Sequence, residues 1–168
     1  MTSANGSDGG PQRAPEETRL DFLVGPWQAA GVVHPGRFGP GGTCTGDAEY
    51  RWDLRGKWLT YTSRLTLPGL GLYEVRGGVA YDPRAGRYRA FAFNNLGVLL
   101  AYDGAWEDDA RLVFYVAYPD AREKSRIAYT RLADGSVQLV SESAADGVRY
   151  EAYFETMLTR ARESGAAR

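Results

Sequence analysis

Arg89 is the residue whose type and position most suggest chemistry. It is expected three residues into a strand, on a face that it shares with aromatic side chains such as Phe91. A buried guanidinium without a counter-charge is strongly destabilising, and no carboxylate is expected on that face. A carboxylate, enolate or carbonyl of a ligand would therefore pair with Arg89, helped by stacking on neighbouring rings. The alternative is that Arg89 reaches solvent at the end of the strand, as we expect for Arg87.

Other reactive residue types are few. His34 is the only histidine, and it precedes a Gly/Pro-rich loop, residues 35–42, that we interpret as a lid over one end of the fold. One histidine without clustered carboxylates cannot build a zinc or non-haem iron site, and His34 has no orienting partner that would make it a general base. Cys44, the only cysteine, is interpreted as a small buried residue. No Ser-His-Asp arrangement, P-loop or dinucleotide fingerprint is present, so we expect no metal and no cofactor.

The elements that would position these residues follow a rhythm of strands and turns. A short helix is expected over residues 16–24, because Leu20 and Leu23 share a face and Gly25-Pro26 ends the pattern. Two helical turns are too short to be stable alone, so this helix is expected to cap or plug the rest. The candidate strands, separated by turn-forming residues, are 27–33, 43–53, 58–65, 72–81, 87–94, 97–106, 111–118, 124–132, 136–144 and 148–158.

The turns also predict how the strands pair. A two-residue turn at Arg55-Gly56 places Tyr50 opposite Tyr61, and a loop over residues 82–86 places Val79 opposite Arg89. Five hairpins treated in this way agree on one apolar face, and no helices remain to cover a flat sheet. We therefore predict an all-β fold, a closed antiparallel up-and-down barrel of about ten strands with a short N-terminal helix. The register around residues 134–135 leaves the facing of strand 124–132 undecided.

The predicted inward face alternates large aromatic residues with small ones such as Gly77 and Ser141. The predicted ligand-binding residues on it are Arg89, Trp27, Tyr50, Trp52, Tyr61, Tyr73, Phe91, Phe93, Tyr102, Trp106, Tyr115 and Tyr150. Large residues beside small ones would leave a void for an apolar ligand, with a few polar groups to orient it. The alternative is a filled barrel whose tyrosines reach its two ends.

Composition sets the outer limits of the interpretation. The 168 residues predict a disordered tail over 1–15, one barrel domain over 16–160 and a second disordered tail over 161–168. A net charge of -1 gives no case for nucleic acid or for an anionic membrane surface, and no apolar stretch is long enough to span a bilayer. The single cysteine and the absence of a signal-like segment favour a cytoplasmic location. A homodimer is suggested by an apolar set expected on the outer face, namely Leu99, Ala101, Leu112, Phe114 and Val116.

Five segments of the sequence resemble a known bacterial family. They are FLVGPW at 22–27, GKWL at 56–59, AYDP at 80–83, YDGAW at 102–106 and IAYTR at 127–131. Over roughly residues 18–160 the chain is similar to the lipocalin-like domain-of-unknown-function family 1579, which is related in architecture to the calycins and nitrobindins. The resemblance implies a barrel of about ten antiparallel strands around a small-molecule cavity, and it implies no chemistry. Nitrobindin-like relatives hold haem through a histidine late in the chain, and no histidine follows His34 here.

Two functions of different classes follow from these observations. The first is binding of a small, largely apolar molecule, aromatic or polyketide- or terpenoid-like, inside the barrel. The second is a cofactor-independent cyclase or isomerase of secondary metabolism, in which Arg89 and the tyrosines would polarise a carbonyl of such a molecule. The sequence does not decide between them.

Overall fold

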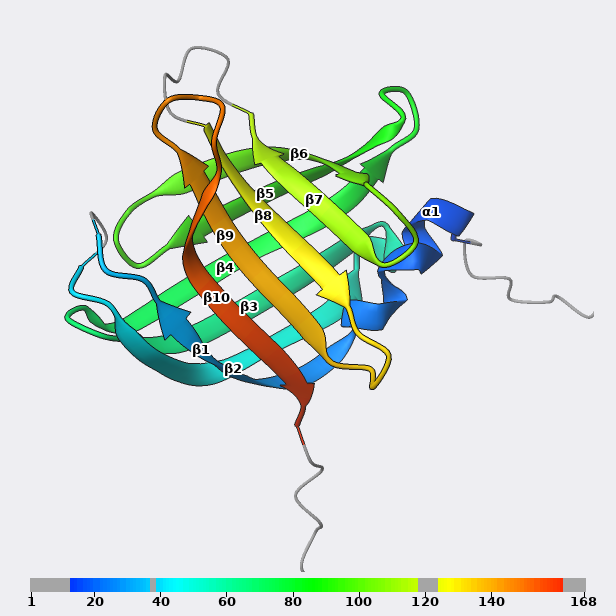
Figure 1. The fold of residues 1–168 in the computed structure, drawn as a ribbon. Helices are drawn as coiled ribbons and strands as arrows, with labels where there is room; N and C mark the ends of the chain where they lie inside the picture. The colour runs from blue at the N-terminus through cyan, green and yellow to red at the C-terminus, as the bar shows by residue number, and fades with distance from the viewer. Residues whose placement is uncertain (1–12, 37–38, 118–123, 162–168) are drawn as a thin grey trace, which may run out of the picture.

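The chain forms a closed β-barrel with a helical segment at one end (Figure 1). The structure, a computed structural model, describes residues 13–36, 39–117 and 124–161. The elements are α1 (Pro15–Thr18), the 3₁₀ segments η1 (Arg19–Leu23) and η2 (Leu54–Gly56), and the strands β1 (Gly25–Val33), β2 (Gly42–Asp53), β3 (Trp58–Leu67), β4 (Gly71–Asp82), β5 (Arg87–Asn94), β6 (Leu99–Trp106), β7 (Arg111–Val116), β8 (Lys124–Arg131), β9 (Val137–Ala144) and β10 (Glu151–Arg160).

Every pair of neighbouring strands is antiparallel, and β1 closes the barrel by pairing with both β2 and β10. The predicted fold class is therefore confirmed. The expected helix is one α-helical turn followed by the tighter η1. The predicted tails lie largely outside the described residues, as does part of the loop over 35–42. Among the helices of the described chain, none has the length and apolarity needed to cross a membrane.

The register between β2 and β3 is the one predicted from the Arg55-Gly56 turn. Tyr50 lies opposite Tyr61, and both side chains face inward. η2 makes this turn, with Arg55 at a φ of 59°. Because the side chains of a strand alternate between its two faces, this one pairing fixes the inward set of both strands.

The register between β4 and β5 differs from the prediction by one residue. Val79 lies opposite Ala90 rather than Arg89, because Asp82 still belongs to β4 and pairs with Arg87. The connecting loop therefore holds four residues, 83–86, and not five. A shift of one residue exchanges the two faces of a strand. The expected inward position is therefore wrong for Arg89, Phe91 and Phe93, which face outward.

Tyr115 and Tyr150 also lie on the outer face, contrary to the prediction. Trp106 pairs with Leu112, and the Glu107 backbone N–H donates to the Arg111 carbonyl. The loop before β7 is therefore residues 108–110, one residue shorter than expected, and Tyr115 faces outward. Tyr150 precedes β10, which has a β-bulge just before Phe154, so the inward pattern of β10 does not extend back to Tyr150. The rings of Tyr115 and Tyr150 pack edge to face, with centroids 6.4 Å apart.

The same one-residue change revises the outer patch proposed as a dimer contact. Leu112 and Phe114 are buried and face the barrel interior with Val116, whereas Leu99 and Ala101 do lie on the outside. In β8 the structure decides the facing that the sequence left open. The inward residues of β8 are Ile127 and Tyr129, and Arg126 points outward.

One end of the barrel is closed by a plug, which we define as α1 and η1, residues 15–23 (Figure 1). Leu20 and Leu23 are 0% and 1% exposed, so the apolar face expected from the sequence is fully buried. Two indoles of the barrel wall bind the plug. Trp27 Nε1 donates to the Leu23 carbonyl at 2.6 Å, and Trp52 Nε1 donates to the Asp21 carboxylate at 2.6 Å.

Further contacts fix the start of the plug. The Tyr88 hydroxyl donates to the Glu16 carbonyl at 2.7 Å, and Trp106 Nε1 donates in turn to that hydroxyl at 3.0 Å. The buried carboxylate of Glu17 pairs with Lys57 at 2.9 Å. The plug is therefore held by both apolar burial and directed hydrogen bonds, which explains why so short a helical segment is stable here.

Removal of plug contacts should destabilise the whole barrel. Leu20→Ala is expected to lower the free energy of unfolding by about 2–5 kcal/mol, the range for truncating a fully buried leucine. Leu72→Ala on the exposed outer face is the matched control and should change it by less than about 0.5 kcal/mol. Urea denaturation followed by circular dichroism measures both. Equal small effects would show that the plug is not coupled to the barrel.

Candidate functional site

Five tyrosines face the centre of the barrel. They are Tyr50, Tyr61, Tyr73, Tyr102 and Tyr129, from β2, β3, β4, β6 and β8. Tyr50 and Tyr61 stack with their centroids 5.2 Å apart, and the hydroxyl groups of Tyr50 and Tyr129 interact with each other. The Tyr73 hydroxyl accepts a hydrogen bond from Asn94 Nδ2 at 3.1 Å.

Tyr129 is the member of this tyrosine cluster that the sequence analysis did not assign. Its strand could be paired in two registers around residues 134–135, and only one of them turns Tyr129 inward. The inward partner Phe114 packs edge to face on its ring, with centroids 6.1 Å apart. The usable signal was the Asp134 side chain, which accepts hydrogen bonds from the Ser136 backbone and hydroxyl and so marks where the turn begins.

A glycine makes room for the cluster. A Cβ atom on Gly77 would lie 2.6 Å from both Cζ and Oη of Tyr61, closer than any real contact of this kind. The Tyr61 ring therefore lies across the backbone of β4, where only glycine leaves space for it. The pairing of Tyr61 with Gly77 across β3 and β4 joins a large inward residue to a small one.

Inward-facing side chains differ in accessibility between the two ends of the barrel. Beside the plug most of them are buried, as shown by Leu59, Val79, Tyr88, Leu112, Val137 and Leu158, although Trp52, Tyr81 and Trp106 are only partly buried. Toward the opposite end most of them keep accessible surface although they point into the barrel, as shown by Ser63, Val75, Asn94, Leu100, Ile127 and Ser143. The inner wall is therefore more accessible at this end than beside the plug.

The inner wall is uncharged. Apart from residues that begin or end a strand, no Asp, Glu, Lys or Arg of the described strands faces inward. Hydroxyl and amide groups are the polar groups present at this wall. Such a surface suits an uncharged molecule, because a charge placed there would lose its hydration without gaining a counter-charge.

The predicted site residues separate into three groups. Tyr50, Tyr61, Tyr73 and Tyr102 belong to the central tyrosine cluster. Trp27, Trp52 and Trp106 face inward too, but their indole N–H groups bind the plug or Tyr88, so their role is to close one end. Arg89, Phe91, Phe93, Tyr115 and Tyr150 lie outside the barrel and cannot contact a molecule within it.

Arg89 has its counter-charges on the outer surface. Its guanidinium pairs with Asp103 on β6, and its Nε lies 3.6 Å from Asp82. Asp103 also accepts from Arg87 at 3.0 Å. The Arg89 side chain is 44% exposed. Exposed pairs of this kind contribute little to stability, and no ligand group is needed to explain the position of Arg89.

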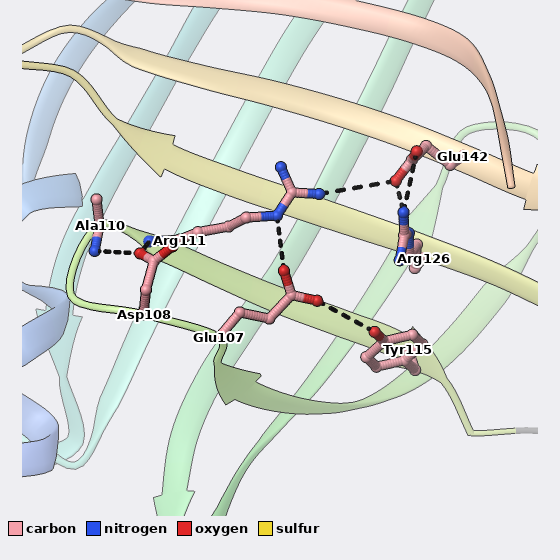
Figure 2. A network of polar contacts seen from close by, with 7 residues as sticks. All are labelled: Glu107, Asp108, Ala110, Arg111, Tyr115, Arg126 and Glu142. Carbon is pink, nitrogen blue, oxygen red and sulfur yellow. Dashed lines mark hydrogen bonds and ion pairs between the residues drawn. The ribbon is translucent and has the colours of Figure 1, made fainter.

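A network of polar contacts crosses the outer face of β7, β8 and β9 (Figure 2). Arg111 donates to Glu107 at 2.9 Å, and its guanidinium reaches over β8 to within 4.0 Å of Glu142. Arg126 pairs with Glu142 at 2.6 Å, and the hydrogen bond from this carboxylate raises the pKa of Arg126 above its ordinary value. The contacts join three neighbouring strands through their side chains.

The two outward tyrosines take part in this outer network. The Tyr115 hydroxyl donates to Glu107 at 3.4 Å, and the Tyr150 ring stacks on the Arg126 guanidinium at 4.1 Å. Val113 and Ala128 lie on the same outer face and are nevertheless 0% and 1% exposed. The long side chains of the network therefore cover small apolar residues, which gives it a role in the stability of the wall.

His34 has a partner that the sequence analysis did not identify, and Cys44 is buried as expected. His34 Nε2 lies 2.7 Å from a Glu155 carboxylate oxygen at the surface. Cys44 is buried, and burial raises the pKa of its thiol, which makes it a poor nucleophile. Among the described residues no group of three or more His, Cys, Asp or Glu side chains is arranged to hold a metal ion.

Comparisons with known proteins support the fold. No protein-family model and no curated protein match the sequence. The crystal structure of Rv2717c from M. tuberculosis is similar, with a TM-score of 0.67 and 18% identity over 90% of this chain and 100% of that chain. A redesigned β-barrel, b11L5F_LGL, has a TM-score of 0.46 and 12% identity over 86% of this chain and 96% of its own. The similarity to Rv2717c is one of fold.

The buried phenols should make stability fall at alkaline pH. Burial raises the pKa of Tyr50, Tyr61 and Tyr129 above the ordinary value near 10. Above about pH 10 the unfolded chain loses these protons before the folded one, so the free energy of unfolding should fall by up to about 1.4 kcal/mol per pH unit per phenol. Below about pH 10 this contribution is fully present. Tyr50→Phe should reduce the slope.

Urea denaturation at a series of pH values measures this slope. Tyrosinate absorbance and circular dichroism are recorded together on the same samples. Ionisation of these phenols while the circular dichroism stays native would contradict the prediction, because it would show that the folded barrel does not raise their pKa.

Proposed function

We propose that the protein binds a small, uncharged, largely apolar molecule inside the barrel, at the end opposite the plug. The observation that carries the proposal is the accessibility of inward-facing side chains at that end. On the same strands, most inward-facing side chains beside the plug are buried. A pocket lined mostly by apolar groups with a few polar ones is the usual form of a small-molecule site.

The chemistry of the wall sets the class of ligand. Val75, Leu100 and Ile127 offer accessible apolar surface, and the partly buried ring of Tyr61, which stacks on Tyr50, offers aromatic surface. Transfer of an apolar molecule from water to such a wall is favourable in proportion to the area covered. Rings pack on rings with an additional gain, so an aromatic or polycyclic frame fits this wall best.

The alternative of a cyclase or isomerase depended on Arg89 to polarise a substrate carbonyl. Arg89 lies on the outer surface, paired with Asp103 and Asp82. Away from the strand ends, the described inner wall has no charged group to take that role. Binding alone requires no such group, and it is the function that the inner wall supports best.

Two neighbouring residues on opposite faces of β3 test the proposal. Ser63 faces inward and is half-buried, whereas Thr62 faces outward and is exposed. Ser63→Trp places an indole in the space proposed for the ligand and should weaken binding of naphthalene derivatives by about tenfold or more, a change of about 1.4 kcal/mol. Thr62→Trp is the matched control and should leave affinity unchanged. Isothermal titration calorimetry measures both.

Circular dichroism first checks that each variant is folded, and Ser63→Leu replaces the tryptophan variant if the larger side chain prevents folding. Equal affinities for the wild-type protein, the Ser63 variant and the Thr62 variant would place the ligand outside the barrel. Absence of binding to the wild-type protein across uncharged aromatic probes would refute the proposal outright.

A further inference from the structure

The hydroxyls of the tyrosine cluster differ in whether the protein already provides a partner. Tyr50 and Tyr129 bind each other, and Tyr73 accepts from Asn94. Tyr102 also has an interaction partner. Tyr61 is different, because no hydrogen bond joins its hydroxyl to any residue that the structure describes. This hydroxyl is not among the buried side-chain atoms that lack a partner, so it is accessible and its partner can come from outside the chain.

The Tyr61 hydroxyl can be reached from within the barrel. Tyr61 faces inward from β3 and keeps accessible surface. Thr156 provides the contrast. Its Oγ1 is the buried side-chain atom that lacks a hydrogen-bond partner of normal geometry in the described chain, and its contact with the Cys44 thiol is weak. Because Thr156 Oγ1 is buried, it cannot form a hydrogen bond with a ligand, whereas the Tyr61 hydroxyl can.

We propose that the ligand carries a hydrogen-bond acceptor oxygen, such as a carbonyl or ether, on its apolar frame, and that the Tyr61 hydroxyl donates to this oxygen. This inference rests on the proposed function, because it assigns one polar contact within the same site. Without ligand, water meets the hydroxyl. The ligand oxygen replaces that water, while the apolar frame covers the neighbouring rings and aliphatic side chains.

The surroundings of Tyr61 set the direction of the hydrogen bond. Burial, with the neighbouring phenols of Tyr129, Tyr102 and Tyr73, raises the pKa of Tyr61 well above its ordinary value. The phenol is therefore protonated at neutral pH and offers a proton. The uncharged wall disfavours an ionised acceptor such as a carboxylate. A neutral oxygen acceptor is the group that fits both conditions.

A pair of probes of equal size separates this inference from binding in general. Acetylnaphthalene carries a ketone, and ethylnaphthalene, substituted at the same ring position, replaces it with a methylene group. The wild-type protein should bind the ketone about threefold to tenfold more tightly, the range for one neutral hydrogen bond. Tyr61→Phe should remove this preference by weakening ketone binding alone. Calorimetry measures the affinities, and the infrared carbonyl stretch of the bound ketone should rise in frequency in the variant.

Two controls define the role of Tyr61. The Tyr61→Phe variant should have the same melting temperature as the wild-type protein, since no hydrogen bond within the protein is lost. Tyr73→Phe removes a nearby phenol that already has a protein partner, and it should keep the preference for the ketone. A preference that survives Tyr61→Phe, or that disappears with Tyr73→Phe instead, would overturn the inference while leaving the proposed function intact. Failure of both probes to bind the wild-type protein would overturn the proposed function and this inference together.

Discussion

Closure of the barrel is the constraint on which the rest of the structure depends. Each strand is paired on both sides, so its register decides which alternate residues meet the interior. A difference of one residue in a turn exchanges the two faces of a strand. β5 shows the consequence: Tyr88 and Ala92 face inward, while Phe91 and Arg89 are placed outside, where Arg89 finds its carboxylates. The interior is therefore neutral because turn lengths, and not composition alone, direct charged residues away from it.

The plug makes the two ends of this closed wall unequal. Leu20 and Leu23 fill one end, and the indoles of Trp27 and Trp52 bind the plug backbone and the Asp21 carboxylate. The largest inward side chains are thereby used as structural contacts at that end. Farther along the strands the inward residues include smaller ones, such as Ser63, and these keep accessible surface. One contact region thus closes one end of the barrel and leaves the inner wall accessible at the other.

The sequence was sufficient for the strands, for closure and for one register, but not for most turns. Its alternation of apolar and polar residues marks each strand, whereas a turn can hold one residue more or fewer without changing that pattern. The missing signal is the aspartate that starts a turn. The Oδ1 atoms of Asp82, Asp108 and Asp146 each accept from backbone N–H groups two and three residues later. Counting the loop before β5 from the residue after Asp82 gives residues 83–86, its observed length. The β-bulge in β10 has no comparable signal.

The errors in register also change the kind of ligand that can be proposed for the interior. With Arg89 inside, the natural ligand would be an anion or an enolate. With Arg89 outside and Tyr129 inside, the polar groups of the interior become neutral hydroxyls, of which Tyr50 and Tyr129 satisfy each other. In the proposed site, a hydroxyl that the fold leaves unpaired and accessible, such as that of Tyr61, is the group that would distinguish one apolar molecule from another. Selectivity in such a barrel comes from the few hydrogen bonds that its own residues do not complete.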